Sequence, residues 1–142
     1  MPATALSIPL PGTDHRRKGV PSGSVNGTFL PARDSELASA LVSYQAGDRL
    51  RFGPVLVELM APALRARLRR YQWLPPAVQP ADLAQQLTLE LLEAASELTI
   101  PEDSRFLGRR LLDHACYRLK RWLACEATVA ASLVSFDEEA AR

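Results

Sequence analysis

The chain has 142 residues, an apolar content of 47 % and a formal net charge of +1 at pH 7. This length accommodates one domain with a substantial core, and the near-neutral charge argues against a general polyanion binder, although where the charges lie matters more than their sum. No apolar run approaches the roughly 20 residues of a membrane span and no secretory signal follows the N-terminus, so we expect a cytoplasmic protein with no membrane partner.

Residues 1–33 are predicted to form a flexible tail. Five prolines and four glycines are spread through this segment, and its large apolar residues are sparse and follow no period. One basic cluster, His15–Lys18, either contacts a phosphate backbone or is a solvated patch.

Helical periodicity begins at Asp34. Asp34 or Ser35 is expected to cap a first helix that ends at Gly47. Asp48 is expected to begin a longer second helix.

Prolines mark the course of the second helix. Pro54 is predicted in the first turn, where its missing N–H does no harm, and Pro62 lies further in and is predicted to kink the helix. The prolines in 75–80 then break the chain before a third helix over 81–98.

A second break, at 100–103, precedes the last helix. With Ser104 as its cap, this fourth helix is predicted to run from about Arg105 to Glu126. No segment shows the period-two alternation of a strand. The predicted fold class is therefore all-α, with a four-helix domain over 34–126.

The predicted third helix is purely acidic among its charged side chains and lies between two Arg-rich ones. We set Leu87 at the centre of the inward face of this helix. A rotation of 100° per residue then places Gln85, Leu89 and Leu92 nearly opposite the core and Glu90 nearer to it. Outward leucines rimmed by carboxylates and amides indicate a surface for a basic protein. The alternative is that this helix is packed on both sides.

The predicted fourth helix carries a cationic stripe opposite its apolar face. The stripe consists of Arg110, His114, Tyr117, Arg118 and Arg121. Guanidinium groups neutralise phosphates and an exposed tyrosine stacks on bases, so this pattern suits nucleic acid; a merely solvated face is the alternative. The arginines in 65–70 either join this stripe in one patch or complement the dipole at the end of the second helix.

No pattern in the sequence indicates catalysis or metal binding. His15 and His114 lie far apart, the spacing of Cys116 to His114 does not suit a nucleophile pair on a helix, and no Gly-rich phosphate loop follows a strand. We therefore expect a protein that is not an enzyme and holds no metal or cofactor.

The order of these segments resembles the second conserved region of bacterial RNA polymerase sigma factors of the extracytoplasmic-function class. In that family an initial helix ends in "AGD", a second contains "YAP", a third begins "DLVQE", and a fourth starts with an aromatic residue and ends in basic ones. Here the matching stretches are AGD at 46–48, LMAP at 59–62, DLAQ at 82–85 and the helix that begins RFLGRR. The resemblance covers 35–126, and SFDE at 135–138 is similar to the start of the family's interdomain linker, so we expect 127–142 to be linker-like.

The resemblance implies roles for both faces. The "DLVQE" helix of sigma factors docks on the β′ clamp coiled coil of core RNA polymerase, which assigns partner binding to Asp82, Gln85, Gln86, Leu89 and Glu90. The fourth helix and the preceding loop recognise the non-template strand of the promoter −10 element and help to open the duplex. This assigns DNA binding to Arg109, Arg110, His114, Tyr117, Arg118 and Arg121, with the loop 102–105 near a captured base.

Two functions remain open from the sequence. The first is a sigma-like transcription factor, and the second is a helical module that binds polymerase or another protein without recognising a promoter. The family's helix–turn–helix domain for the −35 element does not follow Arg142, so we expect either a fragment or a single-domain protein. A second subunit that supplies −35 recognition and an anti-sigma factor are the further partners that the resemblance implies.

Overall fold

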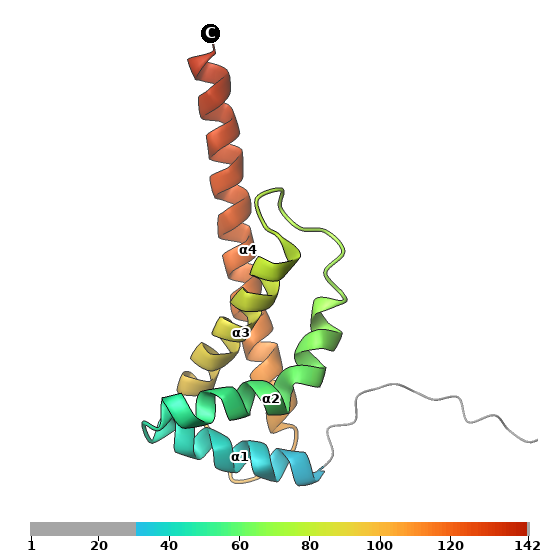
Figure 1. Ribbon diagram of the computed structural model, residues 1–142, viewed down its shortest axis with the longest axis vertical. Helices are drawn as coiled ribbons and strands as arrows, with labels where there is room; N and C mark the ends of the chain where they lie inside the picture. The colour runs from blue at the N-terminus through green and yellow to red at the C-terminus, as the bar shows by residue number, and fades with distance from the viewer. Residues whose placement is uncertain (1–30, 142) are drawn as a thin grey trace, which may run out of the picture.

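The computed structural model describes residues 31–141, and its elements are all helices (Figure 1). They are α1 (Pro31–Gln45), α2 (Arg49–Leu68), α3 (Pro80–Glu97) and α4 (Leu107–Ala140). The described range contains no strand, which confirms the all-α prediction for this part of the chain. Most of the predicted tail, including His15–Lys18, lies outside the described residues.

The helices form two antiparallel hairpins that share one core. α1 packs mainly on α2 and α3 mainly on α4, and Figure 1 shows α1 and the first half of α2 crossing the lower end of the α3–α4 pair. All four helices contribute to the buried cluster, whose largest fully buried side chains are Leu41, Leu56, Met60, Leu87, Leu91, Leu107, Leu111 and Leu119. Burial of this apolar surface is the main force that holds the hairpins together.

The start of α1 differs from the prediction, because Asp34 does not cap this helix. The helix begins earlier, at Pro31, a residue type that suits the first helical position. Asp34 is buried, and its Oδ2 accepts a hydrogen bond of 3.2 Å from the backbone N–H of Phe106. The carboxylate therefore ties α1 to the loop before α4.

Two prolines lie inside α2. The helix begins at Arg49, directly after Asp48 as predicted, so Pro54 is its sixth residue and lies in the second turn rather than the first. Figure 1 shows α2 changing direction in its second half. Pro62 belongs to this half of the helix, and the ring and missing N–H of a proline bend a helix. The bend brings the end of α2 alongside α4.

The last helix is the largest departure from the prediction. It begins at Leu107 instead of Arg105, since Ser104 and the two residues after it form a turn, and it continues to Ala140 instead of ending near Glu126. The segment predicted to be linker-like is thus helical up to Ala140, because it contains no proline or glycine and is rich in alanine. This extension projects beyond the other three helices (Figure 1).

Candidate protein-binding and nucleic-acid-binding surfaces

The outward side of α3 carries three of the residues predicted to bind a partner. Asp82, Gln85 and Leu89 are exposed, and 49 % of Leu89 is accessible to solvent. The Asp82 carboxylate also has a local role, because its Oδ2 accepts the backbone N–H of Gln79 at 3.2 Å, at the start of the helix. A change at Asp82 therefore alters the helix end as well as any docking surface.

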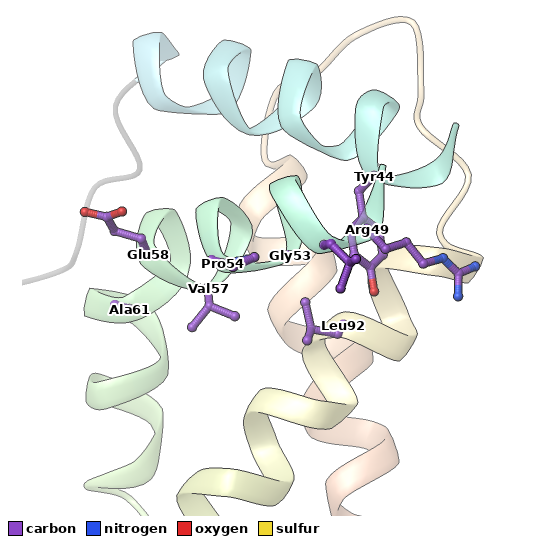
Figure 2. A pocket seen from close by; sticks show the side chains of 9 residues that line it. Tyr44, Arg49, Gly53, Pro54, Val57, Glu58, Ala61 and Leu92 are labelled. Carbon is purple, nitrogen blue, oxygen red and sulfur yellow. The ribbon is translucent and has the colours of Figure 1, made fainter. Parts of the chain in front are cut away.

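Leu92 departs from the prediction that it projects away from the core. It is half-buried and packs against the core cluster, beside Gly53 of α2, where an added Cβ would lie 3.9 Å from Leu92 Cδ2, an ordinary contact distance. In Figure 2, Leu92 points from α3 toward α2 and lines a shallow groove of about 500 Å³. The groove is mainly apolar, with Leu50, Val57 and Ala61 of α2 on its other side.

This groove adds α2 residues that sequence reasoning did not include in the docking surface. Leu50 is 96 % exposed, and it lies two turns of α2 from Val57. The sequence shows only a leucine three residues after Gly47, and nothing in it indicates that this leucine is exposed. Together with Leu89, the groove gives the outward side of α2 and α3 a contiguous apolar character of the kind found at interfaces.

The remaining predicted partner residues face α4. Gln86 donates a hydrogen bond of 2.9 Å to Glu90 Oε1, and Glu90 Oε2 accepts one of 2.6 Å from Arg118 Nε. Arg118 Nη1 lies 3.1 Å from Glu97 Oε2, so one guanidinium group joins two carboxylates of α3. We call Gln86, Glu90, Glu97 and Arg118 the α3–α4 network.

The α3–α4 network is partly shielded from water, with 13 % of the Glu90 side chain and 31 % of the Arg118 side chain exposed. The hydrogen bond to Glu90 raises the pKa of Arg118, an effect that its partial burial opposes. Two residues that the sequence assigned to different ligands therefore bind each other. Part of the charge segregation seen in the sequence is neutralised inside the fold.

The outward side of α4 keeps three of the predicted nucleic-acid residues accessible: Arg110, Tyr117 and Arg121. They are spaced seven and four residues apart, which places them on one stripe of the helix. Tyr117 is 61 % exposed, and neither arginine forms an ion pair with any residue that the structure describes. We call these three residues the α4 stripe.

The other predicted members lie on the flanks of α4. Arg109 is exposed but its Nε lies 3.8 Å from Asp113 Oδ2 one turn away. His114 is half-buried, and its Nδ1 is buried with no hydrogen-bond partner among the described residues. Arg118 belongs to the α3–α4 network.

The loop before α4 presents an aromatic residue that the sequence reasoning did not single out as a site. Phe106 has a φ of 60° and its side chain is 64 % exposed. This backbone conformation is unfavourable for a bulky residue, and the hydrogen bond from its N–H to the buried Asp34 helps to hold it. In the same loop, Asp103 Oδ1 accepts the Arg105 N–H at 3.0 Å, which fixes the turn that precedes Phe106.

Comparison with known proteins yields no match. Neither protein-family models, curated protein sequences nor solved structures match the chain. Within residues 31–141, no helix has the length and apolar content that a bilayer crossing requires. Among the same described residues, no three His, Cys, Asp or Glu side chains are grouped so that they would hold a metal ion.

Proposed function

We propose that the chain is a sigma-factor-like transcription initiation protein that binds core RNA polymerase through α3 and promoter DNA through α4. The observation that carries the proposal is the presence of two separate exposed surfaces of different character. One is the apolar and acidic outward side of α3 around Leu89, and the other is the cationic α4 stripe with an exposed tyrosine. The family order of motifs in the sequence supports the same assignment.

The surface on α3 suits the basic β′ clamp coiled coil. Leu89 supplies apolar contact area, Asp82 and Glu93 supply exposed carboxylates, and the groove beside Leu92 accepts an apolar side chain of the partner. Gln86 and Glu90 support this surface from the α3–α4 network. A direct contact would require Glu90 to exchange Arg118 for the partner and Gln86 to exchange Glu90 for it.

The surface on α4 suits an unpaired DNA strand. Arg110 and Arg121 neutralise phosphates, and Tyr117 between them offers a ring for a base to stack on. Phe106 offers a second exposed ring at the start of the same helix, next to the loop that the sigma resemblance places near a captured base. Exposed rings beside cations suit an unpaired strand better than duplex DNA, and the sigma resemblance implies that this strand is the non-template strand of a −10 element.

A second function has its own support. In a helical module that binds polymerase or another protein without promoter recognition, the cations of α4 would serve the fold, as Arg118 already does with Glu90. The two functions make opposite predictions for DNA binding.

The test uses two pairs of matched variants. Leu89→Arg is expected to abolish capture of core RNA polymerase, whereas Val42→Arg, a comparably exposed residue on α1, is expected to leave it intact. Arg110→Gln with Arg121→Gln is expected to weaken binding of a single-stranded −10 oligonucleotide by about tenfold or more. The control, Arg65→Gln with Arg69→Gln, removes the same charge from α2.

Each outcome of this test has one interpretation. Loss of polymerase capture in Leu89→Arg together with unchanged DNA binding in every arginine variant would favour the module without promoter recognition. Retention of polymerase capture by Leu89→Arg would exclude the α3 surface as the docking site.

A further inference from the structure

A second set of cations lies on the flank of α4 that faces α2. Asp113 is at its centre, with Arg67 Nη2 of α2 at 3.1 Å from Oδ1 and Arg109 Nε at 3.8 Å from Oδ2. Arg67 and Asp113 are 46 positions apart in the chain, and the bend in α2 brings Arg67 to α4. The end of α2 and the middle of α4 thus form one surface.

Two more cations belong to the same surface. Arg70 follows the end of α2, where its backbone N–H donates to the carbonyl oxygen of Arg67 at 3.0 Å. Burial raises the pKa of the Cys116 thiol, and the charges of Arg67, Lys120 and Arg70 oppose that rise. Lys120 lies one helical turn from Cys116, and both Lys120 and Arg70 are exposed. We call this group the α2–α4 basic patch: Arg67, Arg70, Arg109 and Lys120.

The fold alone does not account for four cations here. Among the described residues, Asp113 is the one carboxylate that pairs with the patch, so like charges outnumber their counter-charge and repel one another. The dipole at the end of α2 accounts for Arg67, which lies in its last turn. It does not account for Arg109 and Lys120, which lie on α4.

We propose that the α2–α4 basic patch binds the phosphate backbone of the same nucleic acid strand whose bases meet the α4 stripe. This inference rests on the proposed function and extends the nucleic-acid track from α4 onto the end of α2. The two surfaces adjoin, because Lys120 lies about 60° around the helix from Tyr117. A polyanion that spans both relieves the repulsion within the patch.

The chain offers a matched control on the same helix. Arg65 and Arg69 are exposed, but at 100° per residue Arg65 lies about 200° around α2 from Arg67, away from α4. Their replacement removes the same charge from the protein without touching the patch.

The test measures how salt affects binding of a fluorescent single-stranded oligonucleotide and of its duplex to the whole chain. The plot of log association constant against log salt concentration has a negative slope. For Arg70→Gln with Lys120→Gln, its steepness is expected to decrease by about 1.4 for a single strand, or by about 1.8 if the duplex is bound. Affinity at fixed moderate salt is expected to fall by roughly tenfold. Arg65→Gln with Arg69→Gln is expected to leave the slope unchanged.

Failure of this inference is distinct from failure of the proposed function. If the patch variant binds like the unmodified chain while Arg110→Gln with Arg121→Gln loses binding, the patch is wrong and DNA recognition by α4 stands. An equal decrease in steepness for the control variant Arg65→Gln with Arg69→Gln would mean that only net charge matters, and would overturn the proposal for the patch.

No binding of either oligonucleotide by the unmodified chain overturns both proposals. Binding of poly-glutamate that the patch variant loses, with DNA binding unchanged, assigns the patch to an acidic protein instead.

Discussion

Arg118 lies on the flank of α4 that faces α3, and its guanidinium group is shared between Glu90 and Glu97. The Glu90 side chain is only 13 % exposed, so if the Arg118 guanidinium group were removed, water could replace it only in part. Arg118→Gln is therefore expected to lower the free energy of unfolding by about 1.5–3 kcal/mol, measured by urea denaturation. Arg110→Gln, on the same helix but without an ion pair to any described residue, is expected to stay within about 0.5 kcal/mol. Equal effects of the two changes would mean that the ion pair to Glu90 contributes little.

Arg118 also shows how much of the candidate site could be predicted from the sequence. Spacing on a helical wheel correctly placed Glu90 near the core and Arg110 on the outside, because both follow from the period of one helix. It did not show that Arg118 and Glu90 meet, since that depends on how two helices cross. For the same reason Leu92 was expected outside, although it packs toward α2 beside Gly53.

At the scale of elements, α4 was predicted least well at its ends and best along its middle. The apolar face expected opposite the cationic stripe is buried and runs through Leu112, Ala115 and Leu119, because burial selects apolar residues at helical spacing. The stop near Glu126 was wrong, since only a proline or glycine would have marked an end and none is present. The start of α1 was missed because a buried Asp34 and a capping Asp34 have the same sequence signature.

The same helix offers a test of where the core ends. Leu119 and Leu133 are separated by two heptads and occupy the same face of α4, but Leu119 is fully buried and Leu133 is 64 % exposed. Leu119→Ala is expected to lower the free energy of unfolding by about 2–5 kcal/mol, and Leu133→Ala by less than about 0.5 kcal/mol. The measurement is thermal or urea denaturation followed by circular dichroism. A large loss in Leu133→Ala would show that the extension of α4 packs against something in solution.

For the molecule as a whole, one core joins both hairpins, and polar contacts tie them through the Arg67–Asp113 ion pair and at both ends of α1. Gln45 Nε2 of α1 donates to the carbonyl oxygens of Ala95 and Leu98 at 2.8 Å each, and Asp34 accepts from Phe106 at the other end of α1. The carbonyl groups at the end of α3 would otherwise lack helical partners. Neither hairpin therefore keeps its buried surface and its end contacts without the other.

This arrangement predicts a single cooperative unfolding transition. Trp122 is half-buried at the edge of the core and reports on the α3–α4 hairpin, whereas Trp73 is 90 % exposed and reports little. In the Trp73→Phe variant, the urea curves from Trp122 fluorescence and from far-ultraviolet circular dichroism are expected to coincide, because the helical signal of α1 and α2 is lost together with the packing around Trp122. Separate midpoints for the two signals would mean that the hairpins unfold independently. The binding surfaces on α3 and α4 would then not be held in a fixed relation by the rest of the fold.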